Sequence, residues 1–444
     1  MPKAKNAAHQ EKTKISSPDG PTQRLPTSST VGRTNADERQ PPYWSEIPAN
    51  VLREIYQRSA DVDRASMARV CKSWREGFHD PCLWRNKTIM FCHHQDEQAL
   101  KVGDGFKYTC GRNAIKLVKQ FPRYLKTLTI TFMPAEWHSF TGMMNDFQTF
   151  SKLLDDANLK SIIFVEMESL RLTGQMRANF FKALKRLIEK QTFLEILFMD
   201  NIHFDTESGL QFLKSLATSS GATLSLLSIK GFFLKEIPTL REREWVTGLQ
   251  KLTKLRYIHM DYATMSEEVI KSWTKSSPLL KYICLQAEEF SPDFWTFMRR
   301  SRRAYPLSDH LIPCEAWQDL VTTHPDLTVT LKVEEIESTR KMLPILSPAI
   351  PMSKLRWQVR EDGATSESEL TELLHRVARY HRTIKELFLE IPGDFPRIDT
   401  VSVQSILSNC RNLLPFTCEK SVYSFTERNV WRLRQVNSKL SKDT

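Results

Sequence analysis

Residues 43–91 read YWSEIPANVLREIYQRSADVDRASMARVCKSWREGFHDPCLWRNKTIMF, and this stretch decides how the chain is organised. It contains three short helical patterns, each ending in a turn signal and each too small to bury a core alone. The first begins at Pro48, because proline is tolerated at the start of a helix. Its apolar residues fall on one helix face that needs a partner surface: Val51, Leu52, Ile55 and Tyr56.

The second and third patterns complete this helical unit. Asp63 is the predicted N-cap of the second helix, and Trp74 and Phe78 lie one turn apart in the third. Asp80-Pro81 then ends the helical region. About fifty residues is close to the lower size limit for independent folding, so we expect another protein to cover part of the apolar surface.

The spacing of these residues resembles the F-box, whose pattern is Leu-Pro, aliphatic pairs, Val-Cys-x-x-Trp-Arg and Pro-x-Leu-Trp. The matching positions here are Ile47-Pro48, Val51, Leu52, Ile55-Tyr56, Val70-Cys71, Trp74-Arg75, Pro81 and Leu83-Trp84. Three residues stand where the family usually has aliphatic side chains, which predicts weaker docking to a partner: Ser59, Arg64 and Arg69. The alternative is a small helical bundle buried inside a larger domain.

Composition narrows the class of protein. With 444 residues, 41% hydrophobic and 26% charged, the chain is long enough for two or three domains.

Residues 1–41 are poor in aliphatic side chains and lack the apolar core of a signal peptide, so we expect a disordered tail. No run of eighteen apolar residues occurs, so we expect a soluble protein with no membrane contact. Eight scattered cysteines are typical of reduced thiols and predict a cytoplasmic or nuclear location, or both.

The net charge of +11 raises the question of nucleic-acid binding. The densest basic run, Arg299–Arg303, is short, and no nucleic-acid-binding pattern surrounds it, so nucleic acid is not an expected partner. Cys92-His93-His94 lacks the paired spacing of a zinc site, and we expect no metal and no cofactor. No motif of a nucleophile, phosphate loop or metalloprotease occurs, so no catalytic residue is predicted.

A hexad of the type Leu-x-x-Leu-x-Leu recurs from about residue 111 onward. Its first positions are 125, 159, 194, 224, 255 and 280, which lie 34, 35, 30, 31 and 25 residues apart, and then 384 and 413. Two weaker strand-like pieces, Val329/Leu331 and Trp357/Val359, fall between the sixth and seventh hexads. Helical stripes separate the hexads, as in residues 177–190. A period near thirty with alternating strands and helices indicates stacked repeats.

This pattern resembles leucine-rich repeats, although residues such as Met133 and Met167 replace the usual asparagine or cysteine after the hexads. The predicted fold is α/β: a three-helix F-box at 42–92, then an irregular leucine-rich-repeat solenoid of parallel strands and helices at 93–444. An ordinary α/β sheet with buried parallel strands is the alternative. The combination is most similar to F-box-only proteins with divergent repeats, a subgroup that includes F-box only proteins 39 and 33. The residues that carry this finer match are Asp63-Arg64, Leu83–Ile89 and Phe121–Leu125.

The resemblance implies a non-catalytic role in ubiquitin ligation. F-box proteins are substrate-recognition subunits of SCF-type (Skp-cullin-F-box) E3 ubiquitin ligases: the F-box binds a Skp-type adaptor on a cullin-RING scaffold, and the other domain holds a protein substrate. The adaptor-binding residues that it implies are Pro48, Leu52, Ile55, Val70, Cys71, Trp74, Leu83 and Trp84. The two tryptophans are expected to contribute most, because aromatic anchors dominate interfaces.

Stacked coils commonly bind partners through the residues between and after the inward leucines. The first such row predicts these substrate-binding residues: Thr129, Ile163, Phe198, Ser228, His259 and Cys284. The alternative for this row is strand surface that a loop covers, because buried parallel strands are apolar on both sides. A neighbouring row holds Thr131, Val165, Asp200, Lys230, Asp261 and Gln286. Two alternative functions stay open. One is an F-box scaffold for protein interactions without ubiquitin transfer, and the other is a repeat protein whose helical unit only caps the first coil.

Overall fold

A computed structural model describes the chain between residues 44 and 435, except for 60, 93–108, 134–139, 166, 168–173, 235–238, 289–310, 394, 396, 414–415 and 423–428. The predicted tail at 1–41, the dipeptide His93-His94 and the basic run 299–303 lie outside these residues. The chain divides into two units, residues 1–47 and 48–444. The description below concerns the second unit.

The three predicted helices of the helical unit are confirmed. They are α1 (Ala49–Arg58), α2 (Asp61–Met67) and α3 (Lys72–Phe78), followed by the 3-10 turn η2 (Pro81–Leu83). Pro48 is the residue directly before α1. Asp63 is not the N-cap of α2, because that helix already begins at Asp61. Asp80 caps η2 by accepting a hydrogen bond of 2.9 Å from the Cys82 backbone N–H, which ends the helical region where predicted.

The rest of the chain is organised around one sheet, in which the described residues contribute thirteen strands. The strands from β2 to β11 are parallel, in the spatial order β2-β1-β3 and then consecutively to β11. Their bounds are β1 (Asn86–Cys92), β2 (Thr109–Cys110), β3 (Thr127–Met133), β4 (Ser161–Val165), β5 (Ile196–Met199), β6 (Leu226–Ile229), β7 (Tyr257–Asp261), β8 (Tyr282–Glu288), β9 (Thr328–Ser338), β10 (Met352–Ala364) and β11 (Glu386–Pro392). The predicted α/β fold with stacked parallel strands is confirmed.

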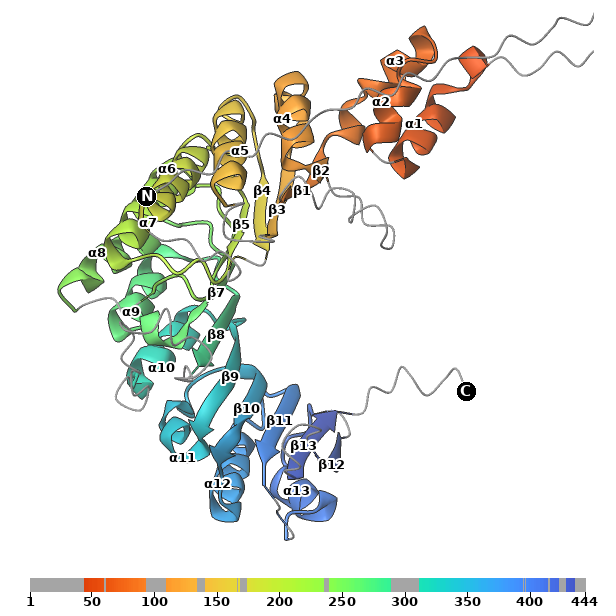
Figure 1. The fold of residues 1–444 in the computed structure, drawn as a ribbon. Coiled ribbons are helices and arrows are strands. Elements are labelled where there is room, and N and C mark those ends of the chain that lie inside the picture. Colours follow the sequence, from red (N-terminus) through yellow and green to blue (C-terminus); the bar gives the residue numbers. More distant parts are fainter. Residues whose placement is uncertain are drawn as a thin grey trace, which may run out of the picture. The chain divides into compact units, whose positions relative to one another are not determined.

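Helices connect successive strands and lie on one side of them (Figure 1). Neighbouring helices pack against each other from α4 to α10. They are α4 (Gly111–Gln120), α5 (Phe140–Leu153), α6 (Gly174–Glu189), α7 (Thr206–Ser220), α8 (Thr239–Gln250), α9 (Glu267–Ser276), α10 (Cys314–Thr323), α11 (Thr339–Met342), α12 (Glu367–Ala378) and α13 (Thr400–Ile406). The sequence did not predict α4, α10 or α11.

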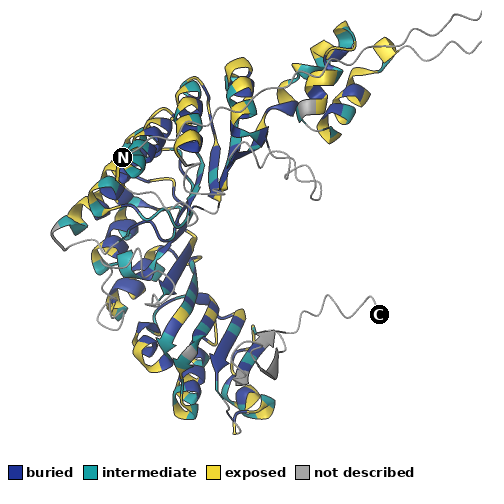
Figure 2. Cartoon of the chain, in the orientation of Figure 1, coloured by how far each residue is buried: buried dark blue, intermediate teal, exposed yellow. Residues whose placement is uncertain are grey.

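The hexads form the core between strands and helices. Leu128, Ile162 and Leu197 are the second leucine-type residues of the first three hexads, and all are fully buried. Figure 2 shows the same division along the repeats, where the strands are mostly buried and the helices expose their outer side. Each coil covers the apolar face of the next, as expected for stacked repeats.

The last hexad was interpreted incorrectly as another parallel repeat. Its residues begin β12 (Phe416–Val422), which pairs antiparallel with β13 (Asn429–Gln435), and β13 pairs antiparallel with β11. Only residues 423–428 separate β12 from β13, whereas a parallel crossover needs a dozen residues or more. The sheet therefore ends in a hairpin.

The sheet begins inside the segment predicted as F-box. β1 covers Asn86–Cys92 and pairs along its whole length with β3, from Asn86 opposite Thr127 to Cys92 opposite Met133. Residues 86–92 are thus the strand that joins the helical unit to the first coil.

Candidate functional site

Four of the eight predicted adaptor-binding residues form the core of the helical unit. Leu52 and Trp84 are each 2% exposed, and Trp74 and Leu83 are also buried. Tyr56 holds the unit together by donating a 2.7 Å hydrogen bond from its hydroxyl to the Trp74 carbonyl oxygen. We expected Trp74 and Trp84 to contribute most to adaptor binding. This expectation is revised, because both side chains are buried against residues of the same chain.

The other four predicted residues remain accessible. Val70 is 56% exposed, Pro48 is exposed, and Ile55 and Cys71 are half-buried. Val51, which the sequence did not assign to adaptor binding, is 45% exposed. Val51 and Ile55 lie four positions apart on one face of α1, and Leu52 and Tyr56 share the buried face. The accessible apolar residues of the helical unit, on α1 and in the turn between α2 and α3, are together called the open apolar patch below: Pro48, Val51, Ile55, Val70 and Cys71.

Trp84 connects the helical unit to the first coil. Its ring stacks on Phe121 with centroids 4.7 Å apart and an angle of 8° between the planes. Its indole N–H donates a 2.8 Å hydrogen bond to the Phe78 carbonyl oxygen. The Lys87 ammonium lies over the ring, 4.6 Å from its centroid, a distance that permits a cation–π interaction.

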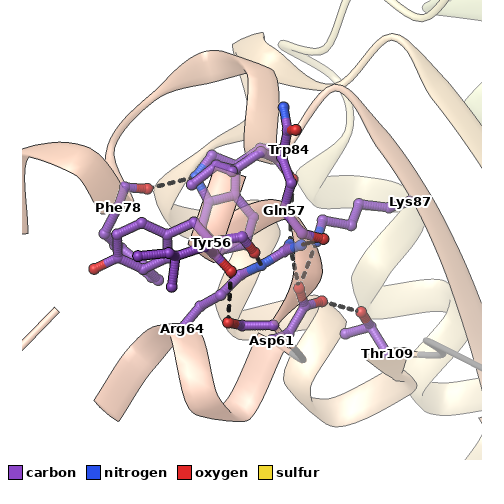
Figure 3. A network of polar contacts seen from close by, with 11 residues as sticks. Tyr56, Gln57, Asp61, Arg64, Phe78, Trp84, Lys87 and Thr109 are labelled. Carbon is purple, nitrogen blue, oxygen red and sulfur yellow. Dashed lines mark hydrogen bonds and ion pairs between the residues drawn. The ribbon is translucent and has the colours of Figure 1, made fainter. Parts of the chain in front are cut away.

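Beside Trp84, a buried polar network ties α2 to the strands (Figure 3). The Asp61 carboxylate pairs with Arg64 at 2.8 Å and with Lys87 at 2.6 Å, and it accepts a hydrogen bond from the Thr109 hydroxyl. Arg64 also donates from Nε to the Tyr56 carbonyl oxygen at 2.6 Å. Burial opposes the charge, but Lys87, Thr109 and Arg64 lower the pKa of Asp61. This group of side chains is called the Asp61 network below.

The Asp61 network explains one departure from the F-box pattern. Arg64 was expected to weaken docking, but its side chain is buried and binds the carbonyl oxygens of Tyr56 and Gln57 at the end of α1. Both carbonyl groups belong to the last turn of α1, where a guanidinium can supply hydrogen bonds that the helix itself does not complete. Arg64 therefore belongs to the interior of the unit.

The predicted substrate-binding residues do form one continuous row. Thr129 lies opposite Ile163, Ile163 opposite Phe198, and Phe198 opposite Ser228. The row continues from Ser228 to His259 and from His259 to Cys284. Its first three members are half-buried and its last three are buried, so the accessible part of the row is its apolar end.

At the polar end of this row lies a second network, called the Asp200 network below. The Ser228 hydroxyl donates to Asp200 Oδ1 at 2.6 Å and lies 3.0 Å from His259 Nδ1, which is 3.6 Å from Asp200 Oδ2. Burial opposes a charged imidazole, but Asp200 and Cys284 raise the pKa of His259 to about 9. Burial also opposes the Asp200 charge, yet hydrogen bonds from His259, Ser228 and the Lys230 backbone lower the pKa of Asp200.

This network does not have the geometry of a Ser-His-Asp site. Such a site needs the serine and the aspartate on opposite ring nitrogens, whereas Ser228 and Asp200 both lie at Nδ1 of His259. Within the described ranges, no three His, Cys, Asp or Glu side chains are grouped so that they could hold a metal ion. Of the described helices, none is both long and apolar enough to cross a bilayer.

The aspartates take over a task that leucine-rich repeats usually assign to asparagine. Asp261 accepts from the Gly231 backbone N–H at 2.9 and 3.0 Å, and Asp200 accepts from the Lys230 backbone N–H at 3.1 Å. Both bonds connect neighbouring coils at the turn after the strand. The sequence showed that the usual asparagines after the hexads are absent. It did not show that aspartates replace them, because Asp200 and Asp261 come earlier in the chain than the usual asparagine position.

Comparison with known proteins identifies the helical unit. Residues 44–90 match the model of the F-box-like family. F-box/LRR-repeat protein 21 from Mus musculus is 43% identical over 42 residues, which are 10% of this chain and 10% of that protein. Putative F-box/LRR-repeat protein 22 from Arabidopsis thaliana is 35% identical over 74 residues, 16% of this chain and 22% of that protein. The matches thus span between a tenth and a quarter of these relatives.

Similarity to solved structures is weak. A leucine-rich repeat-containing protein, LegL7 from Legionella pneumophila, aligns with a TM-score of 0.30 and 10% identity, over 60% of this chain and 76% of that chain. A TLR13–ssRNA13 complex aligns with a TM-score of 0.28 and 13% identity, over 69% of this chain and 41% of that chain. At these scores the likeness adds nothing to the fold described above. Residues 44–90 are therefore an F-box-like domain, and parallel α/β repeats follow it in the chain.

Proposed function

We propose that the chain is the substrate-recognition subunit of an SCF-type E3 ubiquitin ligase and has no catalytic residue of its own. In this role the F-box binds a Skp-type adaptor, which joins it to a cullin-RING scaffold. The repeats hold a protein substrate close to the ubiquitin-charged enzyme, so the chain accelerates transfer by proximity.

The open apolar patch is the observation that carries this proposal. The helical unit closes its own core with Leu52, Tyr56 and Trp84 and still exposes Val51 and Val70. Exposed aliphatic residues on a small helical unit are typical of a surface that another protein covers. Among the predicted contacts, Pro48, Ile55, Val70 and Cys71 are therefore retained, and Val51 is added.

Two finer assignments complete the proposal. The subgroup that includes F-box only proteins 39 and 33 is supported by Leu83–Ile89 and Phe121–Leu125, which form the junction around Trp84. The scattered cysteines favour the cytoplasm, the nucleus or both. For the substrate, the row from Thr129 to Cys284 is the proposed surface, with the half-buried Ile163 and Phe198 as its apolar contacts.

Adaptor binding is the first test. The full chain and a Val51→Asp/Val70→Asp double variant are compared for binding to a Skp-type adaptor by biolayer interferometry. A charge placed in a buried interface core costs more than about 2 kcal/mol, so we expect at least about thirtyfold weaker binding. Val401→Asp on α13 is the matched control, because Val401 is 70% exposed and lies outside the F-box.

Two results separate the ligase from its alternatives. If wild-type chain does not bind the adaptor, the helical unit serves only the repeats and the proposal is wrong. If the adaptor and cullin bind, but the reconstituted complex ubiquitinates neither the chain nor any client captured after proteasome inhibition, the chain is a scaffold outside ubiquitin transfer.

A further inference from the structure

The residues directly before strands β1 and β3 to β8 form a continuous row along one edge of the sheet. After the first member, each backbone N–H in this row donates to the carbonyl oxygen of the member before it, over 2.7 to 2.9 Å. Neighbouring members are therefore about one strand spacing apart, roughly 4.8 Å. In chain order the row consists of Arg85, Lys126, Lys160, Glu195, Ser225, Arg256 and Lys281.

Most of this row is cationic. Five of its seven members are Arg or Lys, and among the described residues only Lys160 has an ion-pair partner, Glu195 at 2.6 Å. The four other cations are exposed, except for one half-buried lysine. They do not belong to the last turn of a helix, where a cation would offset the helix dipole. These four are called the basic edge below: Arg85, Lys126, Arg256 and Lys281.

The opposite ends of several of these strands carry carboxylates instead. Asp200 directly follows β5, and β7 and β8 end at Asp261 and Glu288. Cations and carboxylates are thus separated between the two edges, in a chain whose net charge is +11. Evenly spaced cations along one edge, without counterions among the described residues, favour a linear polyanion as partner.

Exposed aromatic side chains lie along the same edge. Tyr124 lies two positions before Lys126, Tyr282 directly follows Lys281, and Phe193 lies in the loop before β5. Their side chains are 37%, 54% and 56% exposed, respectively. Aromatic rings beside cations are typical of surfaces for single-stranded nucleic acid, because the bases stack on the rings while the cations bind the phosphates. An acidic peptide would use the cations but not the rings.

We propose that the chain binds a single-stranded nucleic acid along the basic edge. The four cations contact phosphates, and Tyr124, Phe193 and Tyr282 stack on bases, so sequence preference is small. The open apolar patch shares no residue with this surface, so this is a second binding function beside adaptor binding. The prediction that nucleic acid is no partner considered the basic run at 299–303. The basic edge escaped it, because its members are far apart in the chain and only the stacking of coils brings them together.

The test measures fluorescence anisotropy of labelled oligo(U) and oligo(dT), each about twenty nucleotides long, with the full chain. The competitors are a DNA duplex of the same length, poly-glutamate and phosphatidylserine vesicles. We expect both single strands to bind at least about tenfold more tightly than any competitor, and the tighter strand shows whether RNA or DNA is preferred. Equal or tighter binding of the duplex, poly-glutamate or the vesicles would overturn the proposal.

The salt dependence of binding locates the site. Four phosphate contacts predict a slope of about −2.8 for log K against log salt concentration, and Lys126→Ala/Lys281→Ala should reduce it to about −1.4. Lys182→Ala/Lys214→Ala is the matched control, because it removes two exposed lysines from the middle of α6 and α7 and should leave the slope unchanged.

The aromatic contacts are tested separately from the charges. Tyr282→Ala should weaken binding at least about fivefold without a change of slope, because base stacking releases no counterions. If the edge and control lysine variants change the slope equally, the effect is general electrostatics and the basic edge is not the site. Adaptor binding, measured in parallel, tests the proposed ligase function independently, because the open apolar patch is unchanged in all these variants.

Discussion

The Asp61 network and the Asp200 network are both built around a half-buried aspartate, but they differ in their cations. Asp61 is held by an arginine and a lysine, Arg64 and Lys87. Asp200 is held by His259, whose charge depends on pH. The contribution of the first network to stability should therefore stay constant near neutral pH, whereas the contribution of the second should change with pH. The difference indicates a permanent junction between the helical unit and the repeats, and a pH-dependent cluster within the repeats.

The largest effect is expected at the joint itself. Trp84→Ala removes a 2%-exposed ring that stacks on Phe121 and spans the two parts of the chain. We expect a loss of about 4 kcal/mol in the free energy of unfolding, as for other buried aromatic truncations. Urea denaturation followed by tryptophan fluorescence measures it. Adaptor binding should fall only as far as the folded fraction does, and a larger fall would restore Trp84 as a direct contact.

Removal of one cation should break the Asp61 network. Arg64→Met leaves Asp61 and the Tyr56 and Gln57 carbonyl oxygens without this donor, and we expect a loss of about 3 kcal/mol. Arg58→Ala is the control, since its pair with Glu54 is exposed and should contribute nothing measurable. If Arg64→Met is as stable as wild type, the network is not a structural joint.

The Asp61 charge makes the stability of the junction between the helical unit and the repeats fall at low pH. The folded pKa of Asp61 is lowered, so its contribution is complete above the unfolded-state value of about 3.9 and is lost as pH falls through the folded value. Asp61→Asn should cost about 2 kcal/mol between pH 5 and 8. The difference from wild type should shrink below about pH 4, as measured by urea denaturation across pH. A constant difference down to pH 2 would show that the charge is not what matters.

The Asp200 network should lose its contribution to stability at high pH. The folded pKa of His259 is raised to about 9, so its contribution is complete below about 6.5 and disappears as pH rises towards 9. His259→Gln should therefore lower stability on the order of 1 kcal/mol at pH 6 and hardly at all above pH 9. An NMR titration of the imidazole checks the pKa directly, and a value near 6.5 would remove the contrast between the networks.

Much of the architecture could be predicted from the sequence, because it depends on the local spacing of apolar residues. The i, i+4 stripes of α1 and α3 and the hexads of β3 to β8 specify apolar faces by spacing alone. Even the row from Thr129 to Cys284 followed, since parallel strands with equivalent hexads align in register. The spacing of apolar residues does not encode the direction of a strand relative to its neighbour. The hexad at Leu413 was therefore assigned to a parallel strand, although the chain forms an antiparallel hairpin there.

The candidate site was harder to predict, because an apolar residue in a helix has two possible uses. Leu52 and Val51 are neighbours of the same type, yet one packs inside the unit and the other faces out. Likewise, nothing local distinguishes Arg64, which is buried against carbonyl oxygens, from Arg69, which lines an open cavity. Only the positions of α1, α2 and the first coil relative to one another assign these roles.

The sequence alone determined the alternation of strands and helices from β3 to β8, the repeat and the F-box pattern, since each rests on side-chain spacing along a few turns or coils. The tertiary structure alone decided that residues 86–92 form the first strand of the sheet, that Trp84 closes the joint and that Val51 stays open. The physical reason is that burial, pairing and ion contacts depend on residues far apart in the chain, such as Asp61 and Thr109 or Trp84 and Phe121, which no local pattern brings together.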